Sequence, residues 1–491
     1  MMTGRNYLAV DLGAESGRTI VGTLTDGNLS LAETYRFSND PVRLPGGLHW
    51  DVLHLWSDIK RGITASSKMF GKNIDSIGID SWGVDFALLD KNKSLLSNPF
   101  HYRDARTDGM LAEAFKRMPR ETIFNHTGVQ FMQINTLYQL LAMVLQKSPL
   151  FDIAKTFVTI PDLFNYWLSG EITNEFTDAT TTQCFDPRKR DWSTAVLNTF
   201  NIPLSLFGSI TDPGTQIGSL LPGVSEEVGA DKLPVIAPAC HDTGSAVVAV
   251  PAQNQDFAWL SSGTWSIMGA EVHEPSLNEK TLEYNFTNEG GVFGTWRLCK
   301  NIMGLWLVQE CHREWNQSYD ELTQLAVQST PFLAVIDPDD ASFLHPGHMP
   351  EKIRSYCVRT RQTIPQTKGE IIRVALESLA LKYRLTLESL ESLTGTHLTP
   401  LHIIGGGTKN KLLDQFTADC TGREVVTGPI EATAIGNMLM QAIALGHIAN
   451  LNEARALVRL SFSPEIYQPC QPDGWDEAYQ KLSKLQETNI S

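Results

Sequence analysis

No hydrophobic run in this sequence comes near the roughly 18 apolar residues that a membrane-spanning helix requires. Close to the N-terminus, only the four apolar residues from Tyr7 to Val10 precede Asp11, which is too short a run for a signal peptide. Together these two absences predict a cytoplasmic protein.

Cysteine is scarce and dispersed. The seven cysteines are odd in number and form neither a CxxC pair nor a Cys/His cluster with metal-binding spacing. This pattern excludes a disulfide framework and a structural zinc site, and it indicates reduced thiols in a reducing compartment.

Positive charge is in deficit. Forty Lys and Arg residues face fifty-five Asp and Glu residues, so the formal net charge is -15. Such a surface repels nucleic acid and anionic membrane, which excludes both as partners. A phosphate-bearing ligand must therefore be held locally, by backbone amides or a metal ion.

The chain is long enough for more than one hydrophobic core, because 491 residues exceed the usual size of one domain. A strand, a glycine turn and a second strand open each half of the chain, first at residues 7–25 and again at 257–271. This repeat predicts an N-terminal lobe over 1–245, a C-terminal lobe over 246–465 and a terminal tail or helix over 466–491. Ligands are expected in a cleft between the lobes.

Hydrophobic periodicity predicts the other elements. Helices are expected at 52–69, 243–250, 304–315 and 369–393, and mainly helical structure at 104–207. Further strands are expected at 29–37, 74–80, 84–89, 233–238, 282–287, 292–298 and 401–404.

The first glycine turn carries candidate phosphate ligands. Gly13 and Gly17 allow backbone N–H groups to converge, as in anion-binding concavities. Ser16 adds a hydrogen-bond donor and Arg18 adds positive charge. Asp11, at the end of the strand, is suited to hold a hydrated Mg²⁺. Taken alone, the segment fits an ordinary tight hairpin equally well.

Two further turns are also candidates for contact with phosphate or a flat ligand. They are Ser261–Thr264, between two strands, and Gly405–Gly407, between a strand and a helix. Each alone also fits an ordinary turn. In this order, the three turns resemble the two phosphate motifs and the adenosine motif of the actin, hexokinase and Hsp70 superfold. The expected fold is therefore α/β, a duplicated, ribonuclease H-like, two-lobed actin-like ATPase fold with a central cleft.

The candidate base is Asp242, which follows an apolar strand and precedes a helix of small residues. Phosphoryl transfer to a hydroxyl needs an acceptor for the hydroxyl proton. The same position also suits a helix N-cap, and both roles are compatible. His241 either contacts the substrate or packs within the turn.

Taken together, these motifs resemble the FGGY carbohydrate kinases over residues from about 7 to 446. The segments that carry the likeness are Asp11–Arg18, Ser76–Phe86, Tyr102–Thr107, Asn135–Leu140, Cys240–Thr243, Ser262–Thr264, Thr287–Gly291, Lys300–Leu307 and Gly405–Gly407.

The resemblance implies a role for each matching residue. Asp242 accepts the proton, and a ketose is contacted by Gly83, His241, Asp242, Thr243 and Asn301. ATP is contacted by Ala14, Glu15, Ser16, Gly17, Arg18, Thr264, Gln309 and Gly406. Mg²⁺ bridges the phosphates and is held through water by Asp11.

Several of these segments are similar to the branch of the family that acts on L-rhamnulose. L-Fuculose and L-xylulose stay open as substrates, and a non-catalytic ATP-binding module is the alternative from another class. Asp85 and Trp82 fit either sugar contacts or structural roles. A monomer or a small homo-oligomer is expected.

Overall fold

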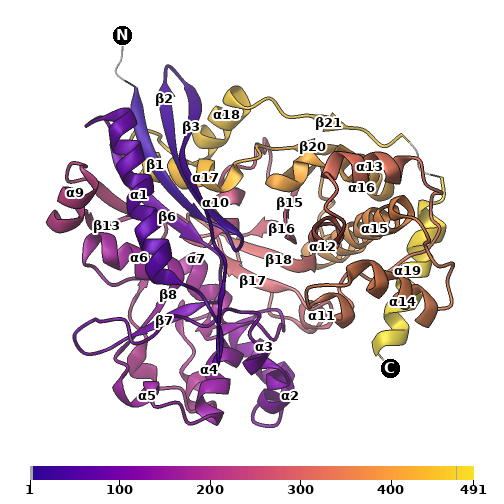
Figure 1. The fold of residues 1–491 in the computed structure, drawn as a ribbon, viewed down its shortest axis with the longest axis horizontal. Helices are drawn as coiled ribbons and strands as arrows, with labels where there is room; N and C mark the ends of the chain where they lie inside the picture. The colour runs from indigo at the N-terminus through magenta and orange to yellow at the C-terminus, as the bar shows by residue number, and fades with distance from the viewer. Residues whose placement is uncertain (1–3, 471–472, 491) are drawn as a thin grey trace. The chain divides into compact units, whose positions relative to one another are not determined.

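The computed structural model describes residues 4–470 and 473–490 (Figure 1). The chain forms two compact units. The first unit contains the chain up to Gln253 together with Glu271–Leu298 and Ala432–Phe462. The second unit contains Asn254–Ala270, Cys299–Glu431 and the residues from Ser463 onward. The units therefore differ from the contiguous lobes that were predicted, because two segments from the second half of the sequence belong to the first unit.

The first unit is built on a six-stranded sheet. Its order is β13 (Thr215–Ser219), β14 (Pro234–Ala237), β6 (Ser76–Ser81), β1 (Arg5–Leu12), β2 (Ser16–Thr25) and β3 (Asn28–Ser38). Strands β14, β6 and β1 are parallel, whereas β13, β2 and β3 run antiparallel to their neighbours. β1 is buried from Asn6 to Leu12, as expected for a central strand covered on both faces.

Helices make up much of the rest of this unit. They are α1 (Val52–Phe70), α2 (Met110–Phe115), α3 (Arg120–Thr127), α4 (Thr136–Leu145), α5 (Leu150–Ile153), α6 (Ile160–Ser169), α7 (Phe176–Ala179), α8 (Thr194–Thr199), α9 (Pro222–Val228), α10 (Asp242–Val248), α11 (Glu279–Glu283), α17 (Ala432–Ala444) and α18 (Leu451–Ser461). Short strands complete the unit: β4 (Val42–Leu44), β5 (Gly47–His49), β7 (Phe86–Leu89), β8 (Thr156–Thr159), β9 (Asn174–Glu175), β10 (Phe185–Asp186), β11 (Asp191–Trp192), β12 (Ile210–Thr211) and β17 (Thr287–Gly290).

Successive side chains of β6 point to opposite faces of the sheet, and this explains why α17 belongs to the first unit. Ile77 and Ile79 lie in the hydrophobic core that also contains residues of α1. On the other face, Ser76 Oγ donates to Gln441 Oε1 at 2.7 Å, and Asp80 Oδ2 accepts from Asn437 Nδ2 at 2.6 Å. Both amide partners lie on α17, so this helix covers the face of the sheet opposite α1 (Figure 1).

One expected strand is wrong. Residues 282–287 were predicted as a strand, but α11 spans Glu279–Glu283, and β17 begins only at Thr287. The helix starts where the Asn278 side chain accepts a hydrogen bond from the Thr281 N–H, which is an N-cap. The cap therefore decides the local structure in place of the alternating pattern.

The second unit repeats the same connectivity. Its strands β16 (Trp265–Val272), β15 (Ala258–Ser262), β19 (Leu401–Ile404), β20 (Val425–Thr427) and β21 (Ile466–Tyr467) lie in that order. Their successive pairings are antiparallel, parallel, parallel and antiparallel, as in β2-β1-β6-β14-β13. The duplication predicted from the two glycine turns is thus present in the strand order.

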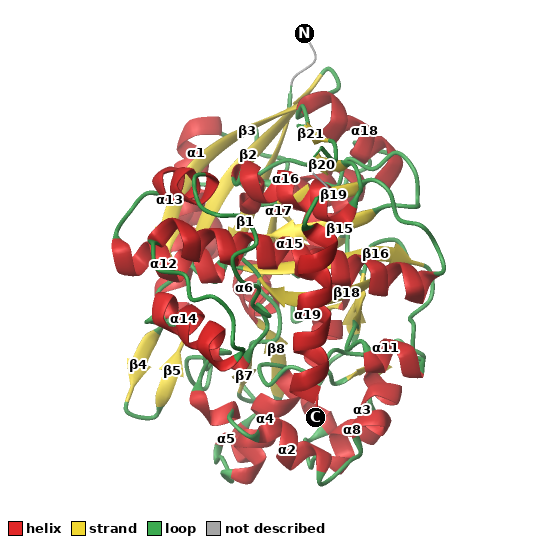
Figure 2. Cartoon of the chain, turned by 90° about the vertical axis from the view of Figure 1, so that its right-hand side faces the viewer, coloured by secondary structure: helices red, strands yellow, loops and turns green. Residues whose placement is uncertain are grey.

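The remaining elements of the second unit are mainly helices. They are α12 (Trp306–Trp315), α13 (Tyr319–Val327), α14 (Met349–Arg359), α15 (Lys368–Thr394), α16 (Lys411–Thr421) and α19 (Trp475–Ile490). Strand β18 (Trp296–Met303) begins in the first unit and ends in the second. The long α15 contacts α12, α13, α16 and α19, as Figure 2 shows.

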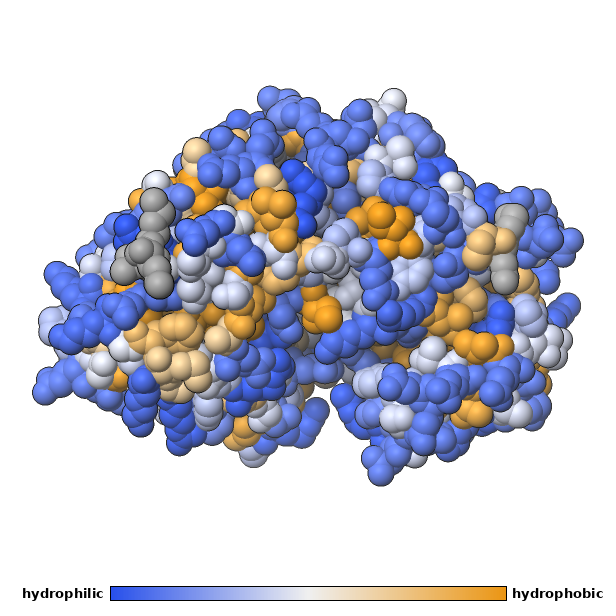
Figure 3. Space-filling view, turned by 90° about the horizontal axis from the view of Figure 1, so that it is seen from above, coloured by the Kyte–Doolittle hydropathy of each residue, from blue (hydrophilic) through white to orange (hydrophobic). Residues whose placement is uncertain are grey.

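Within the described ranges, no helix is both long enough and apolar enough to cross a membrane. On the face drawn in Figure 3, hydrophilic residues predominate and hydrophobic residues lie dispersed among them.

Candidate active site

Three carboxylates gather where the parallel strands of the first unit end. Asp11 on β1 lies opposite Asp80 on β6 in the parallel register. The Ser81 N–H donates to the carbonyl of Cys240 at 2.9 Å, which brings the loop carrying Asp242 to the end of β6. The carboxyl edge of a parallel sheet is where open α/β folds bind ligands.

Asp242 is the first residue of α10, and its side chain is partly exposed. Its Oδ1 accepts hydrogen bonds from the N–H and the hydroxyl of Thr243. Burial raises the pKa of Asp242, while nearby His241 opposes the shift. A raised pKa makes this carboxylate a better proton acceptor, as a general base requires.

The N-cap position belongs to His241 and not to Asp242, which corrects the sequence-based assignment by one residue. The His241 side chain makes no capping hydrogen bond. Asp242 instead places its negative charge in the first turn, where the helix dipole favours it.

The first glycine turn is closed by its own hydrogen bonds. The Gly13 N–H donates to the Ser16 carbonyl at 3.0 Å, and a Cβ at Gly17 would overlap the ring of Phe37. Gly17 is therefore needed for packing, and the N–H of Gly13 is already used. Both glycines therefore have local roles in the turn, and contact of this loop with phosphate stays a prediction.

Arg18 is paired within the same hairpin. Its Nε and Nη2 donate to Asp11 Oδ2 at 2.9 and 2.7 Å, across the register of β1 and β2. Asp11 thus neutralises part of the Arg18 charge that was predicted to meet phosphate. The partly exposed Ala14 and Ser16 and the exposed Glu15 form the tip of this hairpin.

Asp80 is a site residue that sequence reasoning missed. It is fully buried, and burial followed by the charge of Asp11 raises its pKa well above the ordinary value. Its Oδ2 accepts from Asn437, whereas its Oδ1 has no hydrogen-bond partner among the described residues. The signal was available, because the apolar run at 76–80 ends in an aspartate just as the DLG strand does.

Gly83 lies in a constrained loop. A Cβ there would come within 3.0–3.3 Å of Thr181 and Asp178 side-chain atoms. The next residue, Val84, has a φ of 69°, which is an outlier for a β-branched side chain. Its N–H and carbonyl are held by the hydroxyls of Thr181 and Thr136. Such local strain concentrates at ligand sites.

Asp85 and Trp82 have structural roles. Asp85 Oδ2 accepts from the indole N–H groups of Trp50 and Trp82 at 2.6 and 3.1 Å, and from the Tyr102 N–H at 3.2 Å. Burial raises the pKa of Asp85 to about 6. The rings of Trp50 and Trp82 pack at a centroid distance of 4.2 Å. These contacts favour a buried anchor over direct sugar recognition.

In the second unit, the predicted nucleotide residues belong to two connected turns. Thr264 lies in the turn between β15 and β16, and its carbonyl accepts from the Trp306 N–H at 3.2 Å. A Cβ at Gly304 would lie 2.7 Å from the Gly263 carbonyl oxygen and from Ser266, so glycine permits this close approach. Gln309, one turn into α12, has a buried Oε1 without a partner among the described residues, which suits a ligand.

The third glycine turn packs against the second. Gly405 has a φ of 88°, and a Cβ at Gly407 would overlap the hydroxyl of Ser262. Gly406 faces open space, because no atom would lie within 4 Å of a Cβ added there. Asn301 lies on β18, partly buried. The second unit thus holds Thr264, Gln309, Gly406 and Asn301, and the first unit holds the other predicted residues.

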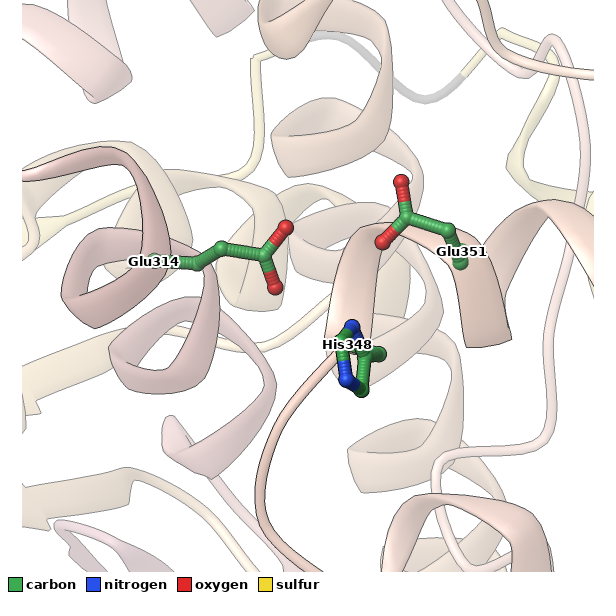
Figure 4. A group of neighbouring side chains, drawn as sticks. All are labelled: Glu314, His348 and Glu351. Carbon is green, nitrogen blue, oxygen red and sulfur yellow. The ribbon is translucent and has the colours of Figure 1, made fainter.

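Outside these sites, Glu314 of α12 lies near His348 and Glu351 at the start of α14 (Figure 4). One ligand atom of each lies within 4.8 Å of the others, but all three side chains are exposed. Exposed acidic groups gather without a metal ion, so we assign no role to this group. None of the seven cysteines forms a disulfide in the described part of the chain, in agreement with the prediction of reduced thiols.

Comparison with known proteins identifies similar sequences and folds. Residues 6–249 match the N-terminal domain and residues 258–445 the C-terminal domain of the FGGY family of carbohydrate kinases. A rhamnulokinase of Bacteroides thetaiotaomicron is 43% identical over 476 residues, covering 97% of this chain and 98% of the relative. A rhamnulokinase of Oceanobacillus iheyensis is 41% identical, covering 95% and 99%. The crystal structure of ligand-bound xylulose kinase from Lactobacillus acidophilus superimposes with a TM-score of 0.82 at 16% identity, covering 99% of both chains.

Proposed function

Because the chain belongs to the FGGY family of carbohydrate kinases, we propose that it phosphorylates L-rhamnulose. The reaction transfers the γ-phosphoryl group of ATP to the 1-hydroxyl and yields L-rhamnulose 1-phosphate and ADP, a step of L-rhamnose catabolism. The observation that carries the choice of ketose is the near full-length likeness to rhamnulokinases at 41–43% identity.

Asp242 acts as the base in this reaction. Its carboxylate accepts the proton of the 1-hydroxyl while the hydroxyl oxygen attacks the γ-phosphorus and the bond to ADP breaks. The raised pKa of Asp242, caused mainly by burial, supports this role. Gly83, His241, Thr243 and Asn301 orient the ketose, and the hairpin tip with Thr264, Gln309 and Gly406 holds ATP.

Carboxylate oxygens are the ligands that Mg²⁺ prefers, and Asp11 and Asp80 supply them at the ends of adjacent strands. The partnerless Oδ1 of buried Asp80 fits a cation or its bound water. When bound, Mg²⁺ neutralises charge on the transferring phosphates. Asp11 and Asp80 would hold it.

A panel of ketoses tests the substrate. We expect kcat/KM to be highest for L-rhamnulose, by at least about tenfold over L-fuculose, L-xylulose and D-xylulose, which corresponds to ~1.4 kcal/mol of transition-state discrimination. ATP consumption coupled to ADP detection measures it. A higher kcat/KM for another ketose would reassign the substrate, and no ATP-dependent turnover on any ketose would contradict the proposed function.

Gly406→Val tests the nucleotide assignment. Because no atom beyond the two neighbouring residues lies within 4 Å of the added Cβ, the fold should be unchanged. We expect ATP affinity to fall by roughly 10- to 100-fold, since overpacking costs about 1–3 kcal/mol and 1.4 kcal/mol is a factor of ten. Calorimetric titration with a non-hydrolysable ATP analogue measures the affinity.

Gly223→Val is the control for this variant, because Gly223 on α9 also has open space and belongs to no predicted site. Its ATP affinity should equal that of the unaltered protein. Unchanged affinity in Gly406→Val would show that the turn at 405–407 is only structural.

A further inference from the structure

A buried ionic pair lies behind His241 in the first unit. Arg297 Nη2 lies 3.1 Å from His241 Nδ1 and 3.2 Å from Glu289 Oε2, and Nδ1 lies 3.3 Å from Oε2. On the other side of the ring, His241 Nε2 lies 3.5 Å from Asp242 Oδ1. Arg297 and Glu289 are almost fully buried, with exposed side-chain fractions of 1% and 5%. The imidazole therefore connects this pair to the proposed base.

The segment Thr287–Gly291 holds the arginine in place. Glu289 supplies the carboxylate, and the Gly290 carbonyl accepts from Arg297 Nε at 2.8 Å. The Gly290 N–H donates to Thr180 Oγ1 at 2.7 Å, which fixes this strand in turn. This segment resembles the family in sequence, but its role follows only from these contacts.

Arginine can only donate hydrogen bonds, and this determines which nitrogen of the His241 imidazole carries the proton. A guanidinium has five N–H donors and no acceptor, so Nδ1 of His241 must accept the hydrogen bond from Arg297. A neutral imidazole whose Nδ1 accepts carries its proton on Nε2. That Nε2–H group points to the side of the ring where Asp242 lies.

Glu289 stays ionised beside this arginine. The pKa of Glu289 is lowered: burial alone would raise it, and the charge of Arg297 is the largest cause that lowers it. Its Oε2 receives no hydrogen bond of good geometry from any described residue, although Arg297 lies within ion-pair distance. Glu289 Oε2, 3.3 Å from His241 Nδ1, is therefore the acceptor that this nitrogen would face if Arg297 were removed.

We propose that Glu289 and Arg297 are positioning residues that hold His241 as the Nε2–H tautomer. In this state His241 is a hydrogen-bond donor toward the ketose and the Asp242 carboxylate, and it does not compete with Asp242 for the hydroxyl proton. The assignment deepens the proposed function and rests on it for the identity of the base. A buried ionic pair is weak evidence for stability by itself, so a role in orienting the site accounts better for this one.

Nitrogen NMR of the unaltered protein is the direct test. With ¹⁵N-labelled histidine, and His241 assigned by its loss in His241→Gln, we expect a proton on Nε2 and none on Nδ1. A proton on Nδ1 in the free enzyme would overturn the proposal. This measurement needs neither substrate nor turnover, so it stays decisive even if no ketose is phosphorylated and the proposed function fails.

Arg297→Met tests the consequence. Glu289 becomes the acceptor, so His241 should switch to the Nδ1–H tautomer and lose its donor on the Asp242 side. We expect kcat/KM for the ketose to fall by about 10- to 100-fold, as when a partner that orients a metal-binding histidine is removed, with KM for ATP unchanged. Arg297→Lys retains a group that only donates and should recover part of the loss.

Arg455→Met is the matched control. It removes a second buried arginine of the same unit, which pairs with Glu271 at 2.7 Å and donates to the Val247 carbonyl at the C-terminal end of α10, the end away from Asp242. Its His241 tautomer and ketose kinetics should be unchanged. A switched tautomer with unaltered kcat/KM in Arg297→Met would overturn the positioning role. If Arg297→Met does not fold, the unaltered protein and Arg297→Lys still decide the tautomer.

Discussion

Asp242→Asn should lower kcat by about 10²–10⁴-fold, the usual contribution of a positioned general base. Asparagine has the same shape and keeps the oxygen that accepts from the N–H and hydroxyl of Thr243. What it loses is the capacity to take a proton from the sugar hydroxyl. The substitution therefore removes the chemistry while keeping the local structure, and ketose and ATP affinities should change little.

Steady-state kinetics with ketose and ATP measure this loss, and circular dichroism checks the fold. Asp51→Asn is the control: Asp51 caps α1 in the same unit by accepting from the His54 N–H, and asparagine caps about equally well. That variant should keep the kcat of the unaltered enzyme. A near-normal kcat in Asp242→Asn would mean that another group accepts the proton.

Gly436→Ala should destabilise the first unit strongly. A Cβ at Gly436 on α17 would overlap the carbonyl oxygen of Ser245 on α10. Because the obstacle is backbone and cannot rotate away, the two helices must separate. Overpacking typically costs about 1–3 kcal/mol and occasionally more, and we expect the free energy of unfolding to fall by about 3 kcal/mol.

Activity should fall with stability in this variant. α10 begins with Asp242, and α17 carries Asn437, which holds the Asp80 carboxylate. Displacing either helix moves a carboxylate of the candidate site, and errors of about 1 Å can cost 10²-fold in rate. Urea unfolding followed by tryptophan fluorescence, together with kcat/KM, measures both effects.

Gly223→Ala controls for the loss of a helical glycine. Gly223 lies in α9 with no atom within 4 Å of an added Cβ, so alanine should be neutral or stabilising by about 0.4–1 kcal/mol. If Gly436→Ala is as stable as Gly223→Ala, the contact between α10 and α17 does not restrict this position.

Local signals in the sequence predicted the long elements well. The apolar periodicity at 52–69 and 369–393 corresponds to α1 and α15, and the apolar run at 401–404 is β19. α15 also has a capping box in which Thr367 and Glu370 exchange hydrogen bonds. The duplicated actin-like fold and membership in the carbohydrate kinases are confirmed by the strand order and the family match.

Short elements and glycine roles were harder to predict. Residues 282–287 alternate like a strand, yet the Asn278 cap starts a helix just before them. Gly13 and Gly17 were predicted from a phosphate-binding pattern, and the structure gives both a local role as well: the Gly13 N–H closes the turn and Gly17 leaves room for the Phe37 ring. In a sequence, a glycine can mark the close approach of a ligand or of a neighbouring side chain. Only the tertiary structure shows which atoms lie beside it.

By itself, the sequence determined the fold class, the carbohydrate kinase family and the identity of Asp242 as the candidate base, because each depends on short motifs and local periodicity. Only the tertiary structure decided that α17 packs on β1 and β6, that Asp80 lies beside Asp11, and that Glu289 and Arg297 stand behind His241. The physical reason is sequence separation. Asn437 is 357 residues from Asp80 in the sequence, and Arg297 is 56 residues from His241. Contacts between such distant residues produce no periodic pattern that can be read from the sequence.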